Sequence, residues 1–423
     1  MKNVLRFVLP LCILTILIVS CTQNRETLPQ QFNHNVQPEK EGVTPEKIAA
    51  LDSIMQSFID QKKVNCAVGF VAKGGKVIYN KAFGYKNIEN QIPARTDDYY
   101  VLYSQTKAIV TAALMTLCDQ GYFTLEDPIS KFLPNFPDKV LTKVNEDGTY
   151  ETEPVNAPCT FAQLLSHSSG IGGGKVNELK RALAKKDSTI KVGFGVKYNT
   201  VKEQVEDAMK YPLGFQPGSQ WNYNIGVDVA AYIIEVITGK PLKDYLQETL
   251  FNPLGMNETA YYYSDPSLRS RFVTAYSVVD GELQPSRNNP EAIFKQGTYY
   301  AGTLGLNGPI EDYAKFCQMM LNGGEFNHHK ILNAETVDAM TKINRVPEDS
   351  TGFQFGIGFQ LFNNPKSKYI PEMSTSCFRW SGAMGTEYMI DPENDLVILY
   401  YINMWGSTNT YNDYLKGVYN LFK

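Results

Sequence analysis

Histidine and cysteine are scarce in this chain of 423 residues, and their scarcity excludes several kinds of site. Four histidines are present: His34, His167, His328 and His329. No Gly-x-Ser-x-Gly segment occurs, so a hydrolase built on a Ser-His-Asp triad is poorly supported. The seven cysteines include no Cys-x-x-Cys pair. We therefore expect no zinc site, no disulfide framework and no cofactor.

Clusters of basic residues and long apolar runs in the body of the chain are missing as well. The formal net charge is −4, and no run of lysine and arginine marks a nucleic-acid surface. We therefore expect no nucleic-acid partner. No stretch after residue 20 is apolar for long enough to predict a transmembrane helix. Residues 44–423 have a globular composition and are numerous enough to bury a sizeable core.

The first twenty residues predict an export signal. Lys2 and Arg6 precede an apolar run at residues 7–19 that is too short to span a bilayer comfortably. Small residues then precede Cys21, an arrangement that resembles the cleavage site of bacterial lipoproteins, in which the cysteine is lipidated. The alternative is an ordinary secretory signal with an incidental cysteine. In the first case, acyl chains on Cys21 would anchor the protein to a bacterial membrane in the cell envelope, facing the periplasm.

The rest of the chain divides into a polar segment and one domain. Residues 1–20 are predicted to be the signal peptide, residues 21–43 an unpacked tether, and residues 44–423 the domain. Its lobes are predicted at 44–100 with 350–423, and at 101–349, the second being mainly helical.

Turn signals near both ends of the domain predict its architecture. Gly74 and Gly75 separate two alternating apolar segments, and residues 391–395 separate two more. Helical patterns begin after Thr44 and close the chain at about 410–422. These elements predict an α+β fold, in which an antiparallel sheet is flanked by the N- and C-terminal helices.

Ser104 and Lys107 give the strongest chemical signal. They share one helical face, ahead of an apolar stripe that predicts a buried helix at about 105–120. A buried amine loses its proton readily and can act as the base for a serine nucleophile. The same tetrapeptide recurs at 188–191, on a segment expected to be solvated. The alternative role of Ser104 is a helix N-cap.

Segments in a fixed order resemble the β-lactamase-related serine hydrolases, which include class C β-lactamases, penicillin-binding peptidases and family VIII carboxylesterases. The resemblance implies that Ser104 is the nucleophile and that Lys107 and Tyr223 move its proton, since a nearby cation stabilises a phenolate. It also implies an oxyanion hole made by the backbone N–H groups of Ser104 and Ala383. His167 is expected to order a loop. The segments are 102–107, 121–134, 164–170, 217–223 and 380–386.

Two departures from the pattern of penicillin-recognising members bear on the substrate. The asparagine expected two residues after Tyr223 is Ile225, and the cation that usually opens the third motif is Trp380. A site without these polar partners loses affinity for a β-lactam or a peptide. We therefore expect Ile225, Trp380, Ser381 and Gly382 to bind an ester or a small amide. The alternatives are a β-lactamase or D,D-peptidase that cleaves a lactam or peptide, and a catalytically weak envelope protein.

Overall fold

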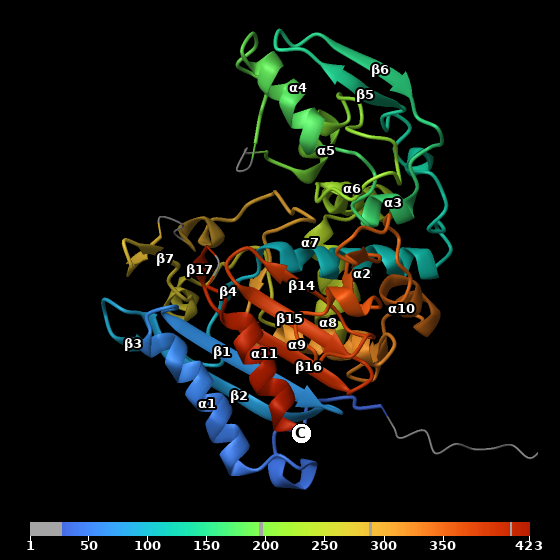
Figure 1. The fold of residues 1–423 in the computed structure, drawn as a ribbon. Helices are drawn as coiled ribbons and strands as arrows, with labels where there is room; N and C mark the ends of the chain where they lie inside the picture. Colours follow the sequence, from blue (N-terminus) through green and yellow to red (C-terminus); the bar gives the residue numbers. More distant parts are fainter. Residues whose placement is uncertain (1–27, 194–197, 287–289, 407) are drawn as a thin grey trace, which may run out of the picture.

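The computed structural model describes residues 28–193, 198–286, 290–406 and 408–423. Its centre is an eight-stranded sheet of strand order β12-β13-β14-β15-β16-β1-β2-β3 (Figure 1). β1 pairs antiparallel with β16, so the two ends of the chain meet in the sheet. The fold class predicted from the sequence is confirmed. The strands are β1 (Cys66–Lys73), β2 (Lys76–Asn87), β3 (Ile92–Pro93), β12 (Gln354–Phe355), β13 (Gln360–Leu361), β14 (Phe378–Gly382), β15 (Thr386–Asp391) and β16 (Leu396–Tyr401).

Alternation along each strand gives the sheet two apolar faces. On one face, Ala67 and Val71 of β1 join the core formed with α1 (Pro45–Asp60) and α11 (Thr410–Leu421). In Figure 1 these two helices, from opposite ends of the chain, lie side by side across the sheet. On the other face, Val68 of β1 joins the core formed with the middle of the chain.

The middle of the chain covers this second face. α2 (Thr106–Asp119) and α9 (Ile310–Leu321) share one continuous core with the sheet. Only the part that carries α4, β5 and β6 projects from it (Figure 1). The sequence did not predict α4 or α10.

The remaining α-helices and strands of the described chain lie between and around these elements. The helices are α3 (Phe161–Leu165), α4 (Gly174–Ala184), α5 (Val201–Ala208), α6 (Gly226–Thr238), α7 (Leu242–Leu246), α8 (Asn252–Leu254) and α10 (Ala334–Thr341). The strands are β4 (Tyr100–Val101), β5 (Lys139–Val144), β6 (Tyr150–Pro154), β7 (Tyr276–Val279), β8 (Glu282–Pro285), β9 (Asn307–Gly308), β10 (Glu325–Phe326), β11 (His329–Lys330) and β17 (Met404–Trp405).

The expectation of an unpacked tether at 21–43 is wrong for residues 28–43. The ring of Phe32 packs edge-on against Phe70 of β1, with centroids 5.1 Å apart, and lies 5.4 Å from Phe326. A single phenylalanine in a polar stretch leaves no periodic pattern, so this packing could not be predicted from the sequence.

The predicted signal peptide at 1–20 and the predicted lipidation site at Cys21 lie outside the described residues. Of the helices that the structure describes, none combines the length and the apolar composition needed to cross a membrane. Export and lipid anchoring stay predictions.

Candidate active site

Ser104 lies in a single 3₁₀ turn, Tyr103–Gln105, that leads directly into α2. Tyr103 has a φ of 43°, a left-handed conformation that non-glycine residues adopt at a cost. Gln105 is fully buried and fixes the turn. Tyr401 donates to its side-chain oxygen at 2.6 Å, and Tyr313 donates to its main-chain oxygen at 3.0 Å. The nucleophile is therefore presented by a strained turn with buried support.

Lys107 joins Ser104 to two distant segments. Its Nζ atom donates to Ser104 Oγ at 3.2 Å and to the main-chain oxygen of Thr303 at 2.8 Å. The same Nζ lies 4.5 Å from the centroid of the Tyr223 ring. The Lys107 residue is only 5% exposed. The structure thus brings the three predicted catalytic side chains together around one buried amine.

Tyr223 is held by aromatic neighbours. Trp380 Nε1 donates to its hydroxyl oxygen at 3.3 Å, and the two rings are 5.4 Å apart. The ring of His167 lies 4.7 Å away. Burial, with a smaller contribution from the Lys107 charge, lowers the pKa of His167 to about 3. The neutral ring accepts from the backbone N–H of Asn224 at 3.4 Å, which agrees with the loop-ordering role expected for it.

Asp228, which was not among the predicted site residues, positions the carbonyl that binds Lys107. It is fully buried in α6 and accepts from the backbone N–H and the hydroxyl of Thr303, both at 2.9 Å. Gln204 donates to its other oxygen at 3.0 Å. Burial raises the pKa of Asp228, while the Thr303 bonds and the Lys107 charge oppose the rise. An acidic residue in the first turn of a helix is ordinary in sequence, so the pattern did not reveal this role.

Gly382 brings the end of β14 against the nucleophile turn. A Cβ atom at this position would lie 2.4 Å from the main-chain oxygen of Leu102 and 2.2 Å from Thr386 Oγ1. Only glycine allows this approach. Ala383, the predicted second oxyanion donor, follows in the exposed turn between β14 and β15.

The other predicted substrate-binding residues lie in different places. Ile225 is the N-cap of α6 and packs against the turn at Gly172. Ser381 does not share a face with Trp380, because neighbouring residues of a strand point to opposite sides. Instead, Ser381 lines a cavity together with Arg379. Ser381 and Trp380 therefore lie on opposite faces of β14, and their part in substrate binding stays a prediction.

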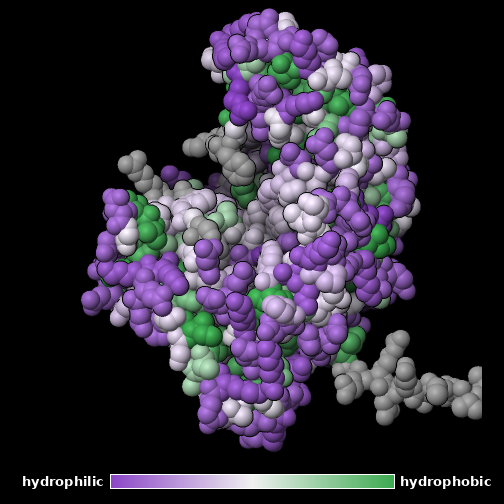
Figure 2. Space-filling model, in the orientation of Figure 1, coloured by the Kyte–Doolittle hydropathy of each residue, from purple (hydrophilic) through white to green (hydrophobic). Residues whose placement is uncertain are grey.

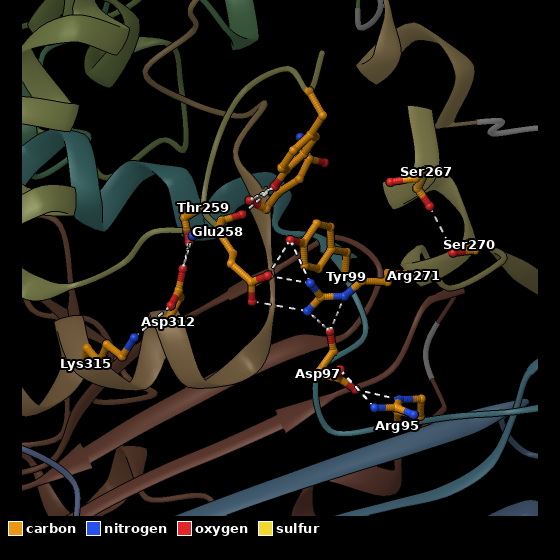
Figure 3. A network of polar contacts seen from close by, with 12 residues as sticks. Arg95, Asp97, Tyr99, Glu258, Thr259, Ser267, Ser270, Arg271, Asp312 and Lys315 are labelled. Carbon is orange, nitrogen blue, oxygen red and sulfur yellow. Dashed lines mark hydrogen bonds and ion pairs between the residues drawn. The ribbon is translucent and has the colours of Figure 1, made fainter. Parts of the chain in front are cut away.

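A polar network anchors the segment that leads into Ser104 (Figure 3). Arg271 Nε donates to the main-chain oxygen of Asp97 at 3.1 Å, and its Nη2 atom donates to Glu258 at 3.1 Å. The Tyr99 hydroxyl donates to the same Glu258 carboxylate at 2.8 Å. Tyr99 directly precedes β4, which pairs with β9. The network therefore holds the strand from which the nucleophile turn emerges.

The cysteines and possible metal clusters of the described chain supply no second candidate centre. Its five cysteines are free thiols, and burial raises the pKa of Cys66 to about 12, so this thiol is not reactive. No group of three or more His, Cys, Asp and Glu side chains in the described ranges could hold a metal ion.

Figure 2 shows that the surface is hollowed beneath the projecting part that carries α4, β5 and β6.

An antiparallel sheet with helices on both faces is a fold that solved structures share. EstCE1, a hydrolase with promiscuous acyltransferase activity, superposes with a TM-score of 0.75 at 22% identity, over 89% of this chain and 98% of that chain. The β-lactamase family matches residues 51–418, and the chain belongs to that family. The family predicted from the order of the segments is thereby confirmed.

Two curated relatives are esterases by name. Esterase EstB of Burkholderia gladioli is 25% identical over 375 residues, which are 84% of this chain and 90% of that protein. Lovastatin esterase of Penicillium rubens is 33% identical over 264 residues, which are 61% of this chain and 62% of that protein.

Proposed function

We propose that the protein is a serine hydrolase that cleaves an ester through an acyl-enzyme on Ser104. The observation that carries the proposal is the buried Lys107 amine, 3.2 Å from Ser104 Oγ and 4.5 Å from the centroid of the Tyr223 ring. A nucleophile within hydrogen-bond reach of a base that is itself held by a third group is the arrangement that acyl transfer requires.

The reaction follows from these contacts. Lys107 and Tyr223 accept the proton of Ser104 while its Oγ atom bonds to the carbonyl carbon. The backbone N–H groups of Ser104 and Ala383 donate to the oxyanion. The bond from the carbonyl carbon to the leaving oxygen then breaks, and that oxygen takes the proton. Water next attacks the acyl-enzyme, gives its proton to the same pair, and releases the acid as Ser104 regains its own.

An ester is favoured over a β-lactam or a peptide by the apolar positions of the site. Trp380 and Ile225 supply no charge for a substrate carboxylate and no amide for a peptide bond. The two relatives named as esterases support the same choice. The substrate would be a small molecule or peptide with an ester bond, whereas an amide or lactam is the alternative that the following test separates.

The test compares turnover of a short-chain p-nitrophenyl ester with turnover of a chromogenic cephalosporin. The Ser104→Ala variant serves as the blank, and a fluorophosphonate probe reports the labelled serine. We expect ester turnover without cephalosporin turnover, and labelling that Ser104→Ala abolishes. Fast cephalosporin hydrolysis would favour a β-lactamase or D,D-peptidase. Labelling that persists in Ser104→Ala would show that Ser104 is not the nucleophile.

We also propose that the protein is exported and lipid-anchored through Cys21, on the bacterial envelope facing the periplasm. The sequence around Cys21 supports this placement. Cys21→Ser should move the protein from the membrane fraction to the soluble fraction of cells. Unchanged membrane retention would show that the anchor lies elsewhere.

A further inference from the structure

A cavity of about 460 Å³ lies on the side of β14 away from Trp380. Arg379 and Ser381 of β14 line it, because they point to the face opposite that of Trp380. Tyr411 of α11 and Ala383 also line it. The cavity therefore borders the residue whose N–H is proposed to stabilise the oxyanion.

The edge of β14 connects this cavity to the nucleophile. β13 pairs with β14 only at Phe378 and Arg379, so residues 380–382 have no strand beside them on that side in the described chain. Trp405, one residue before a glycine of the cavity wall, packs 5.6 Å from the ring of Tyr103 in the nucleophile turn. A substrate held at the oxyanion site can therefore extend around the edge of β14 into the cavity.

The charges in the cavity wall cancel. Arg379 is 5% exposed and forms an ion pair with Glu387. Its guanidinium group also donates to the Tyr369 hydroxyl at 2.7 Å. The same group lies 5.1 Å from the Tyr369 ring centroid and 5.3 Å from the Tyr411 ring centroid. Because Arg379 is already paired with the Glu387 carboxylate, the cavity is suited to an uncharged ligand.

The wall is nevertheless rich in hydrogen-bonding groups. Ser381, Glu387 and Asn412 line it together with Tyr369, Tyr400 and Tyr411. Thr408 and Thr410 add further hydroxyl groups to the lining. A ligand with hydroxyl groups can exchange hydrogen bonds with such a wall, whereas an apolar ligand cannot.

We propose that this cavity binds an uncharged, hydroxyl-rich ring, of sugar or polyol type, that forms one part of the ester cleaved at Ser104. Aromatic faces suit the apolar side of such a ring, and amide, carboxylate and hydroxyl groups suit its edges. The inference rests on the proposed function and names a substrate class for it. The hydroxyl groups can belong to the alcohol or to the acyl part of the ester.

Two matched pairs of esters test the proposal and separate these two cases. Methyl 6-O-acetylglucopyranoside is compared with cyclohexylmethyl acetate for the alcohol side. Methyl quinate is compared with methyl cyclohexanecarboxylate for the acyl side. We expect the hydroxylated member of one pair to have a kcat/KM at least about tenfold higher, because a site built to bind hydroxyl groups rejects analogues without them.

Variants assign the preference to this cavity. Asn412→Ala and Ser381→Ala should each reduce the ratio of the two kcat/KM values by about threefold or more, since each removes a hydrogen-bonding group from the wall. Tyr122→Phe, at a tyrosine that is 47% exposed, is the matched control and should leave the ratio unchanged. Titration with the fluorophosphonate probe gives the active fraction of each preparation.

The outcomes separate failure of this inference from failure of the proposed function. Equal kcat/KM values within both pairs, with normal p-nitrophenyl ester turnover, would overturn the cavity assignment and leave the hydrolase intact. A preference that survives both Asn412→Ala and Ser381→Ala would also overturn it. Absence of both ester turnover and labelling at Ser104 would instead refute the proposed function.

Discussion

The chain contains the same Ser-x-x-Lys spacing twice, and the two copies differ in secondary structure and burial. Ser104 and Lys107 lie at the entrance of a buried helix, with 3.2 Å between Oγ and Nζ. Ser188 and Lys191 lie beyond the end of α4 on an exposed segment that is not helical. A spacing of three residues places two side chains on one face only where a helix forms. The tetrapeptide alone therefore does not make a serine a candidate nucleophile, and the surrounding structure decides.

A lysine above a tyrosine ring does not distinguish the two regions either. Nζ of Lys107 lies 4.5 Å from the Tyr223 centroid, and Nζ of Lys191 lies 4.2 Å from the Tyr198 centroid. What distinguishes Lys107 is burial, the serine hydroxyl and the carbonyl of Thr303. Water is excluded from that amine, so each of its polar contacts counts for more.

The largest expected effect tests this contrast directly. Lys107→Met keeps most of the packing volume but removes the base, so kcat/KM for a p-nitrophenyl ester should fall by about 10²–10⁴-fold. Lys191→Met is the matched control on the exposed copy and should stay within about twofold of the parent. Thermal unfolding of both variants checks that the fold is kept. Equal losses in the two variants would show that burial does not select the active copy.

Gly382→Ala should have the next largest effect, because it pushes the end of β14 away from the nucleophile turn. The new Cβ would lie 2.4 Å from the main-chain oxygen of Leu102. Loss of one oxyanion donor costs about 10²–10³-fold in kcat, and we expect a loss of that order. At Gly214 a Cβ would make only ordinary contacts, at 3.5 Å or more, so Gly214→Ala is the control. Full activity of Gly382→Ala would mean that the close approach is not needed.

Protonation of His167 should weaken the fold around the active copy as the pH falls. Its pKa is lowered from 6.5 to about 3 by burial, so its contribution to stability is complete above pH 6.5 and is lost as the pH falls toward 3. Between about pH 7.5 and about pH 5 the free energy of unfolding should therefore fall by about 2 kcal/mol more in the parent than in His167→Asn. Asparagine suits the φ of 60° at this position.

Urea unfolding at the two pH values measures this difference. His329→Asn, at an exposed histidine, is the control. Its free energy of unfolding should fall between the two pH values by the same amount as that of the parent. A parent and a His167→Asn variant that lose the same stability would show that the ring is not buried in its neutral form.

The sequence could predict what depends on local pattern or on the order of segments. Periodicity and turn residues located the hairpins and the helices at both ends, and the order of the segments located Ser104 and Tyr223. The role of Thr303 could not be predicted in this way. Thr303 lies 196 residues from Lys107 in the sequence, and it contacts Lys107 through its main-chain oxygen, which every residue has. To predict which face of the sheet Ser381 lies on, one needs the register of β14. To predict the packing of residues 28–43, one needs the position of Phe70 in the folded chain.

The smallest predicted effect concerns the two tyrosines beneath the lysines. The Tyr198 hydroxyl donates to Asp207 at 2.9 Å, and burial together with that carboxylate raises the pKa of Tyr198. The Tyr223 hydroxyl oxygen instead accepts a hydrogen bond from Trp380 Nε1 at 3.3 Å, so Tyr223 contacts a donor where Tyr198 contacts a carboxylate.

Trp380→Phe removes this donor and keeps an aromatic ring, so the rate should fall by the value of one hydrogen bond, about 0.5–1.5 kcal/mol, or roughly two- to twelvefold in kcat. Tyr198→Phe should leave kcat unchanged, because that hydroxyl serves only the exposed copy. Single-turnover measurement with the p-nitrophenyl ester separates the chemical step from product release. A chemical step that is as fast in Trp380→Phe as in the parent would mean that the indole only packs against Tyr223, and the difference between the two regions would then rest on burial alone.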